Sequence, residues 1–250
     1  MRIVTNEKVI KRNARIGQFT GLVGLLMLVY GAFISFSQPE QVGLSFGALL
    51  IGFALSQVGI YFGNRYARRP RPDEALNQAL KKLSNAYTLY HYSTAANHLL
   101  VGPAGIWALF PKYQRGRITY EKGKWKQRGG GIGLAYLKLF AQEGLGRPDL
   151  EISVEVDALK KALVEDFPDL NLPDPMVALV FTNPKAEIDA DEADIPTLKV
   201  EDLRKFVNQF GSKGKMRTSF ANAIYNNIVG ELDDEEEIEE YDEDDENDEE

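Results

Sequence analysis

The side chains that the sequence offers for chemistry exclude several classes of function. The 250 residues include no cysteine and only two histidines, His91 and His98. Disulfides, thiolate catalysis and cysteine-ligated zinc sites are therefore excluded, and two imidazoles make no histidine-rich metal cluster. A glycine-rich stretch at 128–133 (RGGGIG) could cradle a phosphate. It lacks the Gly-Lys-Ser/Thr of a P-loop and the full dinucleotide fingerprint, so we interpret it as a flexible connector.

The most informative stretch is residues 97–112, which ends in a lysine. Two short apolar runs, 99–101 and 106–110, flank the tetrapeptide Gly102-Pro103-Ala104-Gly105. Apolar runs this short, bounded by glycine and proline, are typical of buried strands joined by a tight turn. The sequence therefore predicts two buried strands joined by a tight hairpin turn.

Residues 73–125 resemble the NERD (nuclease-related) domain of the PD-(D/E)xK nuclease superfamily. The likeness rests on a helix, a tyrosine-rich strand, and the run His-Leu-Leu-Val-Gly-Pro-Ala-Gly at 98–105. Trp107, Lys112 and the following Arg-Gly-Arg-Ile at 115–118 are in register with the family pattern as well. The resemblance implies a restriction-endonuclease-like fold, in which helices flank a mixed β-sheet.

The resemblance also implies where a catalytic site would lie. In that family an acid on the first helix, an aspartate on the second strand and the glutamate of a Glu-x-Lys motif hold a divalent cation, and the lysine positions the attacking water. In this chain Glu74 and Lys112 match, but Asn97 and Phe110 replace the other two carboxylates. Mg²⁺ requires oxygen ligands, usually carboxylates. We therefore expect a vestigial site, without metal, cofactor or nuclease activity.

An active enzyme is the alternative interpretation. A carboxylate that has migrated to another element, Glu121 or Glu143, would restore a Mg²⁺ site beside Lys112 and make the chain a membrane-tethered nuclease.

A second candidate site follows directly along the chain. Seven basic residues lie at positions 112–128, with three aromatic residues interleaved. Positive charge combined with aromatic faces is typical of nucleic-acid binding without base readout. The alternatives are a solvated hairpin facing anionic lipid and ordinary surface charge. The predicted nucleic-acid-binding residues are Lys112, Arg115, Arg117, Lys122, Lys124, Trp125, Lys126 and Arg128.

The acidic residues are concentrated at the C-terminus. Residues 231–250 carry 16 Asp or Glu and no Lys or Arg, so 21 acidic residues remain against 29 basic ones elsewhere, a balance of +8. We expect this segment to be disordered, because it buries too little apolar surface to offset chain entropy. It could compete with nucleic acid or lipid for the basic hairpin, or it could act as a solubilising or partner-binding tail.

Two apolar runs near the N-terminus predict a membrane anchor. Residues 16–36 and 42–62 contain no charged residue, and about 20 helical residues span a bilayer core. The short connection at 37–41 makes them an antiparallel hairpin. Lysine and arginine precede the first run and follow the second, so the positive-inside rule places both ends in the cytoplasm of a bacterial-type cell membrane. Small residues four positions apart (43 and 47, 59 and 63, 20 and 24) suggest close helix packing or a homo-oligomer.

These observations predict a membrane helical hairpin followed by an α/β domain. We expect a basic N-terminus at 1–15, spans within 16–63, a basic linker at 64–72, the NERD-like domain at 73–230 and the acidic tail. Within the domain, strands are predicted at 87–92, 117–120, 124–126, 176–181 and 197–200, with a loop at 188–195. Helices are predicted at 73–83, 134–142, 149–167, 201–210 and 216–229. The expected role is a non-catalytic binding or scaffold module, with nucleic acid as the leading ligand. The alternative is an adaptor whose acidic tail recruits a basic protein.

Overall fold

The computed structural model describes residues 1–128, 144–211 and 216–247, and it consists of two compact units. Unit 1 contains Met1–Asn6, Asp73–Arg128 and the chain from residue 147 onward, whereas unit 2 contains Glu7–Pro72 together with 129–146. The predicted connector at 129–133, the predicted helix at 134–142 and Glu143 lie outside the described residues. The two apolar helices are therefore inserted into the chain of unit 1, close to its N-terminus.

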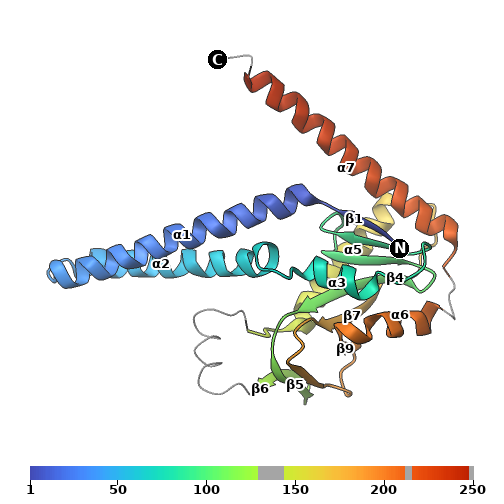
Figure 1. Ribbon diagram of the computed structural model, residues 1–250, viewed down its shortest axis with the longest axis horizontal. Coiled ribbons are helices and arrows are strands. Elements are labelled where there is room, and N and C mark those ends of the chain that lie inside the picture. Colours follow the sequence, from blue (N-terminus) through green and yellow to red (C-terminus); the bar gives the residue numbers. More distant parts are fainter. Residues whose placement is uncertain (129–143, 212–215, 248–250) are drawn as a thin grey trace. The chain divides into compact units, whose positions relative to one another are not determined.

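Unit 1 contains a mixed six-stranded sheet flanked by helices, as expected (Figure 1). The strand order is β1-β2-β3-β4-β7-β9, in which β2, β3 and β4 are antiparallel neighbours and the other pairs are parallel. The strands are β1 (Arg2–Thr5), β2 (Thr88–His91), β3 (His98–Gly102), β4 (Gly105–Lys112), β7 (Met176–Phe181) and β9 (Thr197–Lys199).

The N-terminal strand β1 is a feature that the sequence analysis missed. It was expected to belong to a basic cytoplasmic segment, but it pairs in parallel with β2, with Arg2 opposite Thr88 and Thr5 opposite His91. Backbone hydrogen bonds of 2.9 and 3.0 Å, from Arg2 to Tyr87 and from Asn6 to His91, extend the pairing at both ends. Its sequence, Arg-Ile-Val-Thr, does not alternate between apolar and polar residues, so periodicity did not indicate a strand.

Helices cover both faces of this sheet. On one face, α3 (Pro72–Leu80) and α6 (Leu203–Gly211) pack on a buried cluster that includes Leu100, Trp107 and Leu109. Successive side chains on a strand point to opposite faces, so Phe110 and Lys112 face the other layer. That layer is formed by α5 (Pro148–Asp166) and α7 (Thr218–Asn247), which contact β7 and β3 respectively.

A second, three-stranded sheet departs from the expectation of one mixed sheet. Its order is β6-β5-β8, formed by β5 (Gly116–Glu121), β6 (Lys124–Arg128) and β8 (Ala186–Asp189). The strand β8 corrects the predicted loop at 188–195. Its one large apolar residue, Ile188, pairs with Ile118 between two acidic residues, and so short an alternation is not recognisable among the surrounding acids.

Helix α7 extends into the acidic segment that was expected to be disordered. Its first turns pack into unit 1 through Ala221, Ile224 and Ile228, which are buried. The helix then continues through the acidic segment to Asn247. Glutamate is a good helix former, and extending a helix that is already packed avoids the cost of nucleation.

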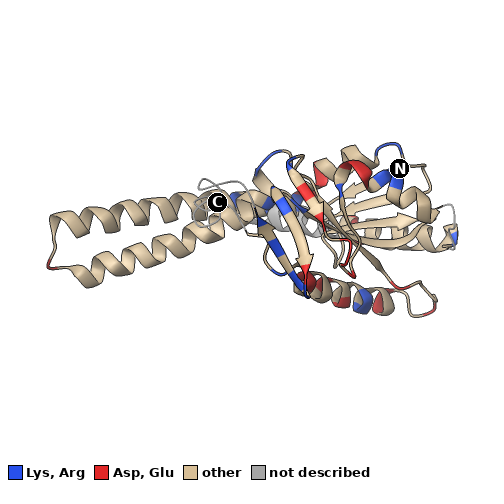
Figure 2. Cartoon of the chain, turned by 90° about the horizontal axis from the view of Figure 1, so that it is seen from below, with Lys and Arg blue, Asp and Glu red and all other residues tan. Residues whose placement is uncertain are grey.

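Unit 2 contains the predicted hairpin of helices α1 (Glu7–Ser37) and α2 (Val42–Phe62), followed by a π-helical turn, η1 (Gly63–Ala67). Both helices are long and apolar enough to cross a membrane. Figure 2 shows them without charged residues along most of their length. Their outer surfaces carry exposed Phe, Leu, Ile and Val side chains, which is the surface that a lipid-facing helix requires.

Small residues spaced by seven form the contact between the two helices. Gly17, Gly24 and Gly31 are buried on α1, and a Cβ at Gly24 would lie 2.7 Å from the backbone nitrogen of Ser56. Ser45 donates a hydrogen bond of 3.0 Å to the Gly31 carbonyl. Close approach of this kind needs residues without bulky side chains. The predicted pair at 43 and 47 is not part of this seam, because a Cβ at either position would meet nothing within 4 Å.

A buried tyrosine makes the stability of unit 1 sensitive to alkali. Burial raises the pKa of Tyr90 to about 12, against smaller lowering effects from Thr88 and Arg2. A tyrosine in the unfolded chain ionises near pH 10. The free energy of unfolding that Tyr90 contributes is therefore fully present below pH 10 and is lost as the pH rises through 12. The total loss is about 2–3 kcal/mol. We expect Tyr90→Phe to flatten the loss of stability between pH 10 and 12. Urea unfolding followed by tryptophan fluorescence at pH 8 and pH 11 measures it.

The Tyr90→Phe variant should still lose some stability as the pH rises, and we expect this remaining pH dependence to come from Tyr87, whose pKa is also raised by burial. A variant with the full wild-type slope would contradict the assignment to Tyr90.

Candidate functional site

The predicted β-hairpin of residues 97–112 is present. Strands β3 and β4 pair with Val101 opposite Ile106 and Gly102 opposite Gly105, so Pro103 and Ala104 form the turn. Gly105 has a φ of +103°, and a Cβ on Gly102 would lie 2.3 Å from the Tyr87 ring. Both positions therefore require glycine.

Asn97 lies at the open end of this hairpin, where the family pattern has an aspartate. Continuing the β3–β4 register by one pair of residues beyond His98 places it opposite Phe110. Its backbone N–H donates to Oε1 of Glu155 at 2.7 Å, and its side-chain amide donates to Oε2 at 2.9 Å. Both oxygens of one carboxylate are thereby engaged by a single residue. Hydrogen bonds to a charged acceptor are among the stronger ones in proteins.

Lys112 ends β4 and is paired in the same way. Its ammonium group forms a salt bridge with Glu151, and its side chain is only 11% exposed whereas that of Glu151 is 41% exposed. Phe110, which occupies the position of the missing glutamate, is buried. The site therefore contains carboxylates, but they come from α5 rather than from the strands.

Glu151 and Glu155 are the functional-site residues that sequence reasoning missed. They lie four positions apart on α5 and therefore on one face of that helix. Their spacing was visible in the predicted helix at 149–167, but nothing in the sequence indicated which strand that face would cover. The two carboxylates proposed as replacements do not take this role in the structure. Glu121 pairs with Lys126 at 2.7 Å, and Glu143 lies outside the described residues.

Glu74 comes from a different layer. It lies in the first turn of α3, the helix that packs on the Trp107 face of the sheet. Asn97 and Lys112 meet the helix on the opposite face. The structure therefore brings Asn97, Phe110 and Lys112 together near α5 and places Glu74 on a helix of the other layer.

The two histidines form a buried pair on the α3 side of the sheet. His91 and His98 are opposite each other on β2 and β3, with 2.8 Å between their Nδ1 atoms. Nε2 of His91 lies 3.1 Å from the side-chain oxygen of Asn77. Because that oxygen only accepts, His91 donates through Nε2, and in its neutral form it accepts from His98 at Nδ1. The pair thus joins α3 to the sheet.

Within the described ranges, no three acidic, histidine or cysteine side chains are grouped so that they could hold a metal ion. Two carboxylates remain near Lys112, and one of them is bound through both oxygens to Asn97. Divalent-metal catalysis of phosphodiester cleavage needs a fixed metal with open positions for water and phosphate. The arrangement seen here fixes the ends of β3 and β4 to α5.

The basic hairpin, formed by β5 and β6, separates its charges from its aromatic rings. Cross-strand pairing places Tyr120 opposite Trp125, with the ring centroids 5.0 Å apart. The side chains of residues 117, 119 and 121 point to the other face, together with those of 124, 126 and 128, because side chains alternate along a strand. Basic and aromatic residues alternate in the sequence, but in the structure they lie on opposite faces of the hairpin.

The charged face of this hairpin is nearly neutral. Arg117 pairs with Asp189 on β8, and Glu121 accepts from Lys126 and lies 3.9 Å from Arg128. Lys126 lowers the pKa of the Glu121 carboxyl by hydrogen bonding and by charge. Four basic residues (117, 124, 126, 128) face three acidic ones (121, 187, 189), which leaves a charge of +1.

The turn of the basic hairpin is formed by Lys122 and Gly123, both with positive φ. This is the geometry of a two-residue hairpin turn of the primed type. Lys122 and Lys124 are exposed there. The remaining predicted residue, Arg115, is partly buried, and its own backbone carbonyl accepts a 2.8 Å hydrogen bond from the side-chain amide of Gln127.

Compared with protein-family models, with curated proteins and with solved structures, the chain gives no match. The likeness to a nuclease-type domain therefore rests on the residues between 73 and 125, and function must be argued from the geometry.

Proposed function

We propose that this chain is a membrane-anchored, non-catalytic scaffold built on a nuclease-like α/β domain. The observation that carries the proposal is the state of the site at the end of β4. Glu151 neutralises Lys112, and Glu155 binds Asn97 through both oxygens. Phe110 fills the place of the remaining metal ligand. Asn97 and Lys112 are therefore both engaged in contacts that hold α5 against the sheet.

The chain topology supports a membrane anchor with both ends on one side. Strand β1 precedes α1, and α3 follows η1, yet both belong to unit 1. One residue, Asn6, separates β1 from α1, so the flanks of the hairpin cannot lie on opposite sides of a bilayer. Basic residues flank the spans at that end, which favours the cytoplasmic side of a bacterial-type cell membrane.

The absence of cysteine makes this topology directly measurable. We expect Ile3→Cys on β1 and Ser84→Cys after α3 to be protected from a membrane-impermeant maleimide in intact cells. We expect Gln41→Cys, in the connection between α1 and α2, to be labelled. All three positions are exposed, so reactivity reports the side of the membrane. Labelling at Ile3→Cys without labelling at Ser84→Cys would refute a shared side.

The acidic segment of α7, as a binding surface for a basic protein, is favoured over the basic hairpin as a binding surface for nucleic acid. Helix α7 starts in the core of unit 1 and continues into the segment with 16 acidic residues, so the domain presents concentrated negative charge to a basic protein. The charged face of the basic hairpin carries only +1, and its aromatic rings lie on the opposite face. A nucleic-acid backbone would find little net attraction there.

A further inference from the structure

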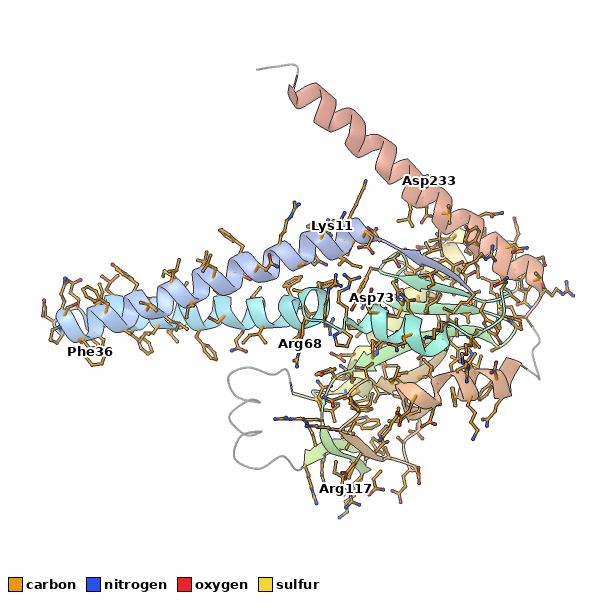
Figure 3. All side chains as sticks on the ribbon, in the orientation of Figure 1. Lys11, Phe36, Arg68, Asp73, Arg117 and Asp233 are labelled. Atoms are coloured by element: carbon orange, nitrogen blue, oxygen red, sulfur yellow. The ribbon has the colours of Figure 1, made fainter. Side chains whose placement is uncertain are left out.

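The strongest unexplained feature outside the site is the charge at one end of the helical hairpin. Eight basic residues flank the two spans: Lys8, Lys11, Arg12, Arg15, Arg65, Arg68, Arg69 and Arg71. The other end has one charged residue, Glu40. Figure 3 shows Lys11 and Arg68 at one end of the helices and Phe36 at the other. We infer that this basic end, centred on Arg12, Arg15 and Arg65, binds the phosphate groups of anionic phospholipids.

The register between the helices places these charges at the same height. Close contacts join Gly17 to Gly63, Gly21 to Gly59 and Gly24 to Ser56, so residues whose numbers add up to 80 lie side by side. Continuing the same register two residues outward puts Arg15 and Arg65 at about the same height along the two helices. The turn η1 still contacts α1 at this level.

In an inserted hairpin, these charges would lie at the depth of the lipid phosphate groups. Arg15 directly precedes the uncharged run of α1, and Arg65 lies three residues after that of α2. The guanidinium of Arg65 lies 4.4 Å from the centroid of the Tyr61 ring. Tyrosine and arginine at the end of an apolar helix are typical of the headgroup region. Arg12 and Arg15 are exposed on α1 and are therefore accessible to lipid from the side.

This inference rests on the proposed membrane insertion and adds a ligand class to it. Juxtamembrane basic residues attract anionic lipid over a short range, whereas a soluble polyanion would have to approach a surface already occupied by headgroups. Anionic phospholipid is therefore the favoured ligand over nucleic acid for this end of unit 2.

The test uses the full chain reconstituted into nanodiscs of phosphatidylcholine with a minor fraction of phosphatidylglycerol. The measured quantity is the ratio of the two lipids that remain with the protein after mild detergent extraction, determined by native mass spectrometry. We expect phosphatidylglycerol to be enriched about tenfold over its bulk fraction. Arg12→Gln, Arg15→Gln and Arg65→Gln, combined in one variant, should return the ratio to bulk. The corresponding triple lysine variant should keep the enrichment.

A matched control removes three basic residues elsewhere. Lys122→Gln, Lys124→Gln and Lys185→Gln alter exposed lysines of unit 1 and should leave the enrichment unchanged. Five basic residues remain at the hairpin in the glutamine variant, so insertion should persist. Retained enrichment in that variant, or none in the wild type, would overturn the inference. Release of the wild-type chain from membranes by alkaline carbonate would instead refute the membrane anchor itself, and the lipid site with it.

Discussion

Deleting residues 1–6 should unfold unit 1, although these residues precede the membrane helices and lie more than 80 positions from β2. Strand β1 pairs along its whole length with β2, and the terminal ammonium of Met1 donates to Asn85 at 2.8 Å. Arg2 also stacks on Tyr225 of α7, 4.1 Å from the ring centroid. Loss of these contacts and of the edge hydrogen bonds should cost on the order of 3–5 kcal/mol, a large part of a domain's stability.

Tryptophan fluorescence is a suitable probe, because both tryptophans, Trp107 and Trp125, lie in unit 1. The matched control replaces residues 7–71 with a flexible Gly/Ser linker and keeps residues 1–6. It should unfold cooperatively as a soluble protein, whereas the same protein without residues 1–6 should not. Equal stability of the two soluble versions would show that β1 is dispensable.

Glu155→Ala should destabilise unit 1 by about 2–3 kcal/mol, because it leaves the N–H and the amide of Asn97 without their charged acceptor. Asn97 is partly buried at the end of β3, so water replaces the carboxylate incompletely. Glu155→Gln should cost less, since its amide oxygen still accepts one of the two hydrogen bonds. Urea unfolding of the full chain in detergent, followed by tryptophan fluorescence, measures the difference.

Glu151→Gln is the matched control at the other acidic position of α5. The Glu151 side chain is 41% exposed, and an ion pair with this exposure contributes about 1 kcal/mol or less. A destabilisation by Glu151→Gln equal to that of Glu155→Ala would contradict the different roles that the geometry gives these two carboxylates.

Much of the fold could be predicted where the sequence has a long apolar run, a helical repeat of apolar residues, or glycine and proline at a turn. The two uncharged runs, the turn at Pro103 and Ala104, and the helix at 149–167 all have such signals, and the structure contains all three. Strand β1 was missed because it lacks an alternation of apolar and polar residues, and strand β8 because it has one large apolar residue among acidic ones. Their pairing depends on partners far away in the chain, which local patterns do not encode.

The site was harder to predict, because tertiary packing decides it. The resemblance grouped Glu74, Asn97, Phe110 and Lys112 as one vestigial site, whereas the structure brings the last three together near α5 and places Glu74 on α3. The sequence could not indicate that Glu151 and Glu155 would cover these three residues, since that depends on which face of the sheet α5 packs against. It also suggested mixed charge and aromatic character for the basic hairpin, whereas strand alternation puts Tyr120 and Trp125 on one face and the charges on the other.

The central claim, that the nuclease-like site is structural, is tested most directly by a cleavage assay. The purified full chain is incubated with single-stranded and duplex DNA and with RNA, in Mg²⁺ and separately in Mn²⁺. We expect no cleavage above a metal-free control, and no difference between the wild type and Lys112→Ala. Metal-dependent cleavage that disappears in Lys112→Ala and in Glu151→Gln would show that Glu151 and Lys112 form a working site, and it would contradict the account given for this protein.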